Sequence, residues 1–114
     1  MAVENWISDR ITQLVDFRRD LHRNPELLYD LPRTAARVAE ALREAGVDEV
    51  HEGIGRTGVV AVIRGRSNRS GRTIGLRSDM DALPIVEATG ADWASEVPGK
   101  MHACGHDGHT AMLL

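Results

Sequence analysis

The sequence predicts an α/β sandwich, and three features of the chain lead to that prediction. Two segments with apolar residues at helical spacing come first, at 5–22 and 32–45. Two β-like segments follow at 57–65 and 72–84, separated by a polar turn. The first of them is apolar at almost every position, which is typical of a strand covered on both faces. Two helices followed by central strands of a mixed sheet indicate an α/β layer architecture.

Residues 5–22 are predicted to form an amphipathic helix. Apolar side chains recur every three or four residues, and charged side chains occupy most of the remaining positions. Pro25 ends this helix, because the residue before a proline is disfavoured in helical geometry. The predicted apolar stripe consists of Ile7, Ile11, Leu14, Val15 and Leu21.

The second predicted helix runs from Pro32 to Ala45. Pro32 suits a first helical turn, where the missing N–H would have no partner in any case, and Gly46 is expected as the C-terminal cap. A short strand is expected at 50–54, before the two longer β-like segments. Residues 85–103 are expected to be a long irregular segment, and long irregular segments in compact domains are often functional.

Composition limits the class of function. The chain has 114 residues, a net charge of −3 and 4% aromatic residues. This allows one domain at most and argues against nucleic-acid or anionic-membrane partners. One local basic group is interpreted as a solvated turn, with an acidic partner as the less favoured alternative. It comprises Arg64, Arg66, Arg69 and Arg72.

Cys104 is the only cysteine, so an internal disulfide is excluded. The N-terminus lacks a signal-peptide pattern, and no apolar run is long enough to span a membrane. Together these features predict a cytoplasmic protein.

Side chains that can bind metal are concentrated near residue 106. Cys104 and His106 lie two residues apart, and in a loop such side chains can converge on one ion. Gly105 and Gly108 favour a loop here, although His102 and His106 could instead share a helix face. A thiolate with an imidazole suits zinc and is tolerable for manganese, cobalt or nickel. The alternative is a buried core cysteine among unremarkable surface histidines.

Two carboxylates follow the predicted strand at 72–84. Asp79 and Asp81 stand at alternate positions, so both can face one site at the strand end, where ligands bind in open α/β sheets. One could bind metal, and the other could accept the N–H of a ligand histidine. The competing interpretation is a pair of solvated aspartates in a turn.

Five segments, in order along the chain, resemble the N-terminal part of the hippurate hydrolase and auxin-conjugate amidohydrolase family. Its members are metal-dependent hydrolases of N-acyl amino acids related to aminoacylases and zinc exopeptidases. The last two segments are specific when taken together, whereas the helical ones would be weak alone. The segments are "DLHRNPEL" (20–27), "RTAARVAEAL" (33–42), "GVVAVIRG" (58–65), "LRSDMDALPIVEATG" (76–90) and "GKMHACGHDGHTAML" (99–113).

The resemblance implies that Cys104 and His106 are metal ligands and that Asp81 supports the metal centre as its catalytic aspartate. Related exopeptidases have a histidine where this chain has Asp79, so that ligand is absent here. Supporting or structural roles are implied for Asp107, His109 and His22. His102 receives no role, and Asn24 stands where the family often has a histidine.

The implied reaction is hydrolysis of the amide bond of N-acyl amino acids with two divalent metal ions, whether zinc, manganese, cobalt or nickel. In the family a general-base glutamate and further ligands lie downstream of these motifs. We therefore expect residues 1–114 to be the N-terminal portion of a zinc-exopeptidase-like catalytic domain, without a dimerisation domain. By itself this portion is expected to be inactive, and the full-length protein is a possible homo-oligomer.

Two other interpretations of the function remain open at this point. One is a related metallo-exopeptidase acting on peptides. The other is a non-catalytic module that binds metal or a partner, or a structural domain in which the histidine cluster is fortuitous.

Overall fold

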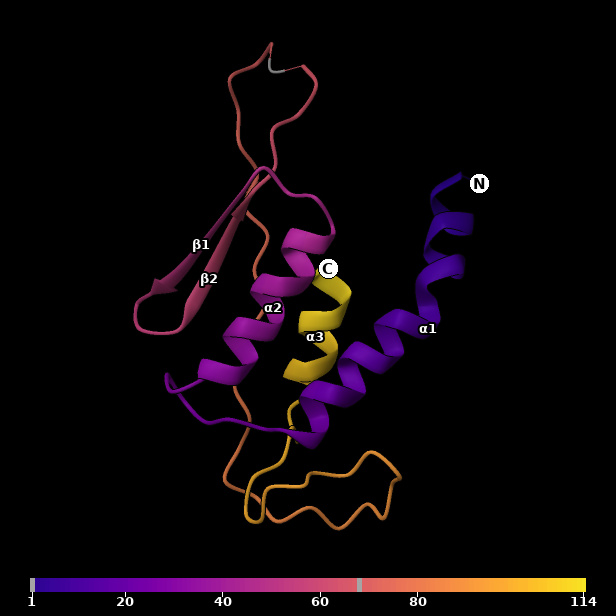
Figure 1. Ribbon diagram of the computed structural model, residues 1–114, viewed down its shortest axis with the longest axis vertical. Helices are drawn as coiled ribbons and strands as arrows, with labels where there is room; N and C mark the ends of the chain where they lie inside the picture. The colour runs from indigo at the N-terminus through magenta and orange to yellow at the C-terminus, as the bar shows by residue number, and fades with distance from the viewer. Residues whose placement is uncertain (1, 68) are drawn as a thin grey trace.

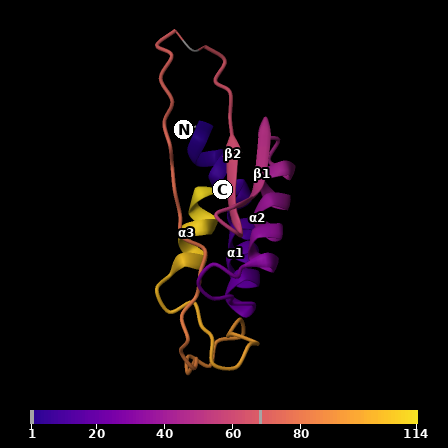
Figure 2. The same cartoon turned by 90° about the vertical axis from the view of Figure 1, so that its left-hand side faces the viewer.

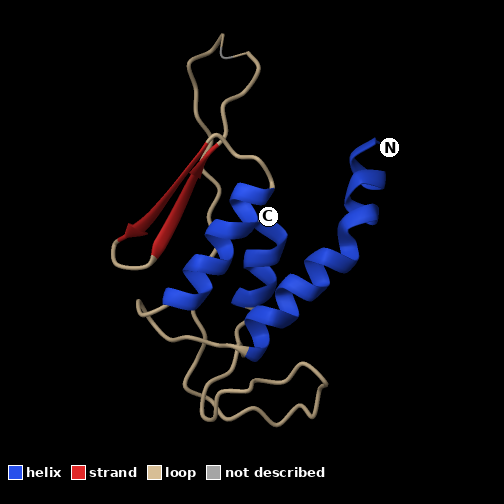
Figure 3. Cartoon of the chain, in the orientation of Figure 1, coloured by secondary structure: helices blue, strands red, loops and turns tan. Residues whose placement is uncertain are grey.

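Three helices and one two-stranded sheet make up the fold over residues 2–67 and 69–114, which the computed structural model describes (Figures 1 and 3). The predicted α/β class is confirmed, and both predicted helices form close to their expected bounds. In chain order the elements are α1 (Ala2–Arg23), α2 (Pro32–Glu44), β1 (Glu49–Ile54), β2 (Gly58–Val62) and α3 (His106–Leu113).

The hydrophobic core lies where α1, α2 and α3 meet. Phe17 and Leu21 of α1 pack with Val38 of α2 and Ala111 of α3, and Leu21 is fully buried. Of the five residues of the predicted α1 stripe, Leu21 belongs to this cluster, and Phe17 joins it although it lies outside the predicted stripe. Ile7 and Ile11 are 44% and 52% exposed, because the N-terminal half of α1 extends away from the other elements (Figure 1).

Helix α2 begins and ends as its sequence predicts. Pro32 occupies the first turn, and Gly46 adopts a left-handed conformation with φ of 79° just beyond the C-terminus. The N–H of Gly46 donates to the carbonyl of Arg43, and the N–H of Val47 donates to the carbonyl of Leu42. This pair of hydrogen bonds is the Schellman arrangement, in which glycine avoids the steric cost of positive φ.

Strands β1 and β2 form an antiparallel hairpin that packs against α2 (Figures 1 and 2). The expected short strand at 50–54 is therefore confirmed. The predicted segment 57–65 corresponds to β2. The expectation that both of its faces are covered is not met by the described residues. Val60 is 46% exposed and Ile63, just past the strand, is 77% exposed.

The segment 72–84 was expected to be a strand, and this expectation is wrong for the described residues. No strand is assigned there, and the segment forms only single bridges, Leu27 with Ala82 and Leu83 with Met101. The physical reason is the lack of a neighbour, because an extended chain becomes a strand only when another chain accepts its hydrogen bonds. Figure 2 shows the segment running past α3, apart from β2.

Residues 85–103 are irregular, as predicted, but they are tied down at several points. Leu83 and Met101 exchange backbone hydrogen bonds of 2.9 and 3.0 Å at the base of this loop. The N–H of Glu96 donates to the carbonyl of Arg23 at the end of α1, at 2.8 Å. The loop therefore packs against α1 at one end of the molecule (Figure 1). None of the described helices combines the length and apolarity needed to cross a membrane.

Leu21→Ala should destabilise the protein by about 2–5 kcal/mol, because a fully buried leucine loses its contacts and leaves a cavity in the core. Urea denaturation followed by circular dichroism measures this change. Leu76→Ala is the matched control, since Leu76 is 76% exposed. Equal losses for the two variants would contradict the placement of the core.

Candidate metal centre

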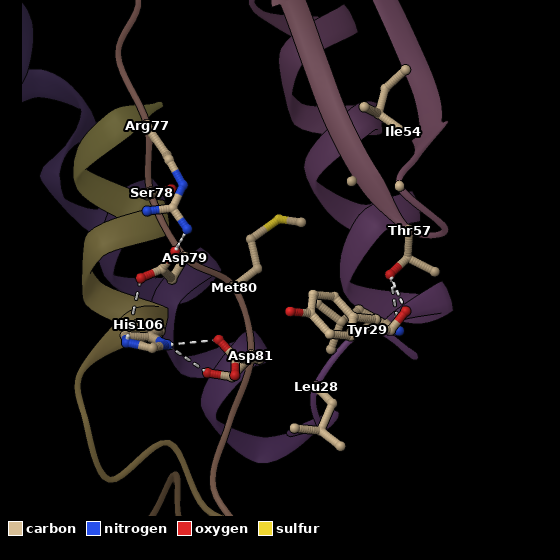
Figure 4. A pocket seen from close by; sticks show the side chains of 13 residues that line it. Leu28, Tyr29, Ile54, Thr57, Arg77, Ser78, Asp79, Met80, Asp81 and His106 are labelled. Carbon is tan, nitrogen blue, oxygen red and sulfur yellow. Dashed lines mark hydrogen bonds and ion pairs between the residues drawn. The ribbon is translucent and has the colours of Figure 1, made fainter.

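His106, Asp79 and Asp81 lie together beside a pocket of about 560 Å³ (Figure 4). His106 is the first residue of α3, whereas the two aspartates belong to the extended segment that passes this helix. The side chains of Tyr29 and Met80 line the same pocket. The structure therefore brings together three of the residues that the sequence singled out, across about 25 intervening positions.

The ring of His106 is fixed by Asp81. Its Nδ1 lies 2.9 Å from the Asp81 carbonyl oxygen and 3.0 Å from the Asp81 carboxylate oxygen Oδ1. Both partners accept hydrogen bonds, so Nδ1 carries the proton and donates it. In the neutral ring, Nε2 then keeps its lone pair free for an electrophile, the arrangement found in histidines that bind metals.

Asp79 stands on the other side of the His106 ring. Its Oδ2 lies 3.9 Å from Nε2, and its Oδ1 pairs with the guanidinium of Arg77. The Asp79 carbonyl also accepts a 3.1 Å hydrogen bond from the hydroxyl of Thr110, which ties the segment to α3. A carboxylate and a free imidazole nitrogen thus face the same small volume.

Cys104 is exposed and free, one residue before Gly105, which precedes the first residue of α3. Gly105 has φ of 87°, a left-handed conformation that separates the cysteine from the helix. We predicted a loop through residue 108, and this is wrong, because the helix begins at His106. The Thr110 hydroxyl and the His109 N–H both bond back to this first turn, which outweighs the low helix propensity of Gly108.

Within residues 2–67 and 69–114, no group of three or more histidine, cysteine or acidic side chains is close enough to hold a metal ion. A catalytic zinc site usually has three protein ligands and a water. The His106 imidazole, with Nε2 unprotonated, suits a zinc ligand. The side chains that converge around it are too few to form a complete zinc site. By themselves, the described residues do not supply the full set of ligands that such a site needs.

A second polar cluster, which the sequence did not reveal, lies on the buried side of α3. His22, at the end of α1, places Nδ1 2.8 Å from Asp107 Oδ2 and Nε2 3.1 Å from Glu87 Oε1. Arg18 donates to the same Asp107 oxygen at 2.8 Å. The side chains of His22, Glu87 and Asp107 are 6%, 5% and 0% exposed. The sequence signals were the supporting or structural roles implied for His22 and Asp107, and nothing in the sequence pointed to Glu87 or Arg18.

Hydrogen bonds keep both carboxylates of this cluster ionised. Burial raises the pKa of Glu87, but bonds from the Thr89 hydroxyl, the Ser95 N–H and His22 outweigh it and bring the pKa to about 2. The pKa of Asp107 is also lowered, since bonds from His22 and the charge of Arg18 outweigh its burial.

His102 packs next to this cluster, with its ring centroid 6.2 Å from that of His22. It is 4% exposed, and neither of its ring nitrogens has a hydrogen-bond partner in the described part of the chain. Burial lowers the pKa of His102, which favours its neutral form.

Comparison with known proteins gives a consistent picture. Residues 75–114 match Peptidase family M20/M25/M40. Thermostable carboxypeptidase 2 of Saccharolobus solfataricus is 50% identical over 113 residues, covering 98% of this chain and 26% of the relative. Hippurate hydrolase of Campylobacter jejuni is 52% identical over 97 residues, covering 85% of this chain and 24% of the relative.

A solved structure agrees with these sequence matches. The Bacillus subtilis YXEP protein, described as a dinuclear metal binding peptidase from the M20 family, superimposes with a TM-score of 0.81 at 46% identity. The match covers 88% of this chain and 27% of that one. The chain thus spans about a quarter of the length of these relatives, and the predicted resemblance to hippurate hydrolases is confirmed.

Acid should weaken the fold through Glu87. Its pKa is about 2 in the folded protein against an ordinary value of 4.5, so its stabilising contribution is complete above pH 4.5 and is lost as the pH falls toward 2. The difference in unfolding free energy between the wild type and Glu87→Gln should shrink over this window. Denaturation at a series of pH values measures it, with exposed Glu44→Gln as control. A difference that stays constant with pH would contradict the assignment.

Proposed function

We propose that this chain, whose residues 75–114 match Peptidase family M20/M25/M40, is the N-terminal portion of the catalytic domain of a metal-dependent amide hydrolase. The proposed substrates are N-acyl amino acids. The observation that carries the proposal is the His106 ring, whose Nδ1–H is held by Asp81 while Nε2 faces Asp79. Identity of 52% to a hippurate hydrolase supports the substrate class.

In this proposal Cys104 and His106 are metal ligands and Asp81 is the catalytic aspartate that orients His106. Two divalent ions would be bound, whether zinc, manganese, cobalt or nickel. Their chemistry there would be to polarise the scissile carbonyl and to lower the pKa of a bound water. Similarity to the YXEP protein, a dinuclear metal binding peptidase, supports a site for two ions. The Asp81 carboxylate holds the proton of His106 on Nδ1, which fixes the ring plane. It also makes Nε2 more basic and so a stronger ligand for a metal ion.

The general base is not assigned to any acidic residue of this chain. Glu87 is unsuited to the role, because it is buried, bonded to His22 and has a pKa of about 2. A carboxylate of such low basicity takes a proton from water poorly. Since the chain spans about a quarter of its relatives, we place the base and the remaining ligands in sequence beyond these residues.

A second candidate function is cleavage of peptides by an exopeptidase of the same family. The 50% identity to a carboxypeptidase favours it. Both reactions hydrolyse an amide bond, so residues 1–114 would serve them in the same way. A cytoplasmic location and a homo-oligomeric full-length protein are further parts of the proposal, and the single cysteine supports the location.

Cys104→Ala and His106→Ala should each lower the amide hydrolysis rate of the complete gene product at least a hundredfold, because each removes a metal ligand. Release of glycine from hippurate and of the C-terminal residue from short peptides, with Mn²⁺ or Zn²⁺ present, measures both candidate activities. His51→Ala is the control, as His51 is exposed on β1. Unchanged activity in both variants would sink the site assignment, and activity on peptides alone would favour the exopeptidase.

Asp81→Asn should weaken metal binding by about 10- to 100-fold, since residues that orient a metal-binding histidine usually have effects of this size. The amide can still accept the Nδ1–H but loses the negative charge that strengthens Nε2. Isothermal titration with Zn²⁺ measures the affinity. Asp92→Asn, at an exposed position in the 85–103 loop, should leave it unchanged. Equal affinities for the wild type and Asp81→Asn would rule out the orienting role.

A further inference from the structure

His22 connects three parts of the chain, and it does so alongside the Arg18–Asp107 ion pair and the contact of Arg19 with the Trp93 ring. It lies in the last turn of α1, Asp107 lies in the first turn of α3, and Glu87 lies in the irregular loop. When ionised, the carboxylates of Glu87 and Asp107 can only accept hydrogen bonds, and one nitrogen of the His22 ring lies within bonding distance of each. A ring that serves two such acceptors must donate from both nitrogens, so His22 is an imidazolium.

The cluster is balanced in charge. Two carboxylates, Glu87 and Asp107, meet two cations, His22 and Arg18, with Arg18 at the solvent edge where its side chain is 40% exposed. Buried charges are tolerated when they are paired and hydrogen-bonded in this way. Loss of the His22 proton would leave one of the two carboxylates without its donor.

The two partners of His22 adjoin the candidate metal centre. Asp107 is the residue after His106, so its anchor sets the first turn of α3. Glu87 belongs to the 85–103 loop, which starts four residues after Asp81 and ends one residue before Cys104, with Leu83 and Met101 bonded at its base. Glu87 also accepts bonds from the Thr89 hydroxyl and the Ser95 N–H, so it organises the loop itself.

We propose that His22 is a positioning residue of the metal centre. As an imidazolium bonded to both Glu87 and Asp107, it holds the loop and the first turn of α3 in one arrangement on α1. Cys104, His106 and Asp81 thereby keep a single relative geometry. This inference rests on the proposed function, since it assumes that these residues form the site.

The test uses the complete gene product with Co²⁺ as the probe, because cobalt reports ligand geometry through its visible absorption and its thiolate charge-transfer band. In His22→Gln one amide can donate to one carboxylate but not to both. Co²⁺ affinity should fall about tenfold, the lower end for residues that orient ligands, and the absorption bands should change. The measurement is made well below the unfolding temperature of the variant. His51→Gln, at an exposed histidine, is the matched control and should match the wild type.

A purely structural His22 would give a different result. In that case the midpoint of thermal unfolding falls while Co²⁺ affinity stays within twofold of the wild type and the spectrum is unchanged, which overturns the proposal. Glu87→Gln weakens only the contact between His22 and the loop. If His22→Gln does not fold, the Co²⁺ spectrum of Glu87→Gln provides the test instead. The double variant His22→Gln/Glu87→Gln should lose little more Co²⁺ affinity than His22→Gln alone, because both substitutions break the same contact between His22 and Glu87. Additive losses of affinity would contradict the proposal.

The outcomes also separate this inference from the proposed function. If Cys104→Ala leaves the Co²⁺ affinity and spectrum intact, the proposed metal centre itself is wrong. If Cys104→Ala removes the thiolate band while His22→Gln changes nothing, the metal centre stands and the positioning role of His22 fails.

Discussion

The buried ion cluster around His22 is the interaction on which the arrangement of this structure depends. It joins the end of α1 to residues 65 and 85 positions away, Glu87 and Asp107. Removing one partner of a buried ion pair costs about 3–5 kcal/mol, because a charge is left without compensation. The small apolar core of Phe17, Leu21, Val38 and Ala111 packs α1, α2 and α3 together, but it does not reach the 85–103 loop. The loop is held on α1 by polar contacts instead.

The candidate metal centre lies one residue beyond that cluster, and the two are joined through α3. Asp107 faces the buried side of the first turn, while His106 faces Asp81 and the pocket (Figure 4). Successive helical residues point in directions about 100° apart, so one turn can present an anchor inward and an imidazole to the site. The left-handed Gly105 lets the chain enter this turn directly after Cys104.

Local patterns predicted most of the fold, and non-local geometry accounts for the errors. The two helices, the Gly46 cap and the irregular 85–103 segment follow from spacing, proline and glycine, which act within a few residues. Residues 72–84 have strand-like composition but no strand beside them among the described residues. The helix start at His106 was missed because Gly105 and Gly108 suggested a loop, whereas tertiary bonds to Asp107 and Thr110 stabilise the turn.

The sequence by itself determined the class of fold, the resemblance to hippurate hydrolases and the residue types available for chemistry, because motifs and periodicity are local properties of the chain. Only the tertiary structure decided which of those residues meet. It placed Asp81 on the Nδ1 of His106 and paired His22 with Glu87 and Asp107, leaving His102 buried without a partner among the described residues. These pairings depend on how α1, α3 and the loop pack, and sequence separation alone carries no information on that packing.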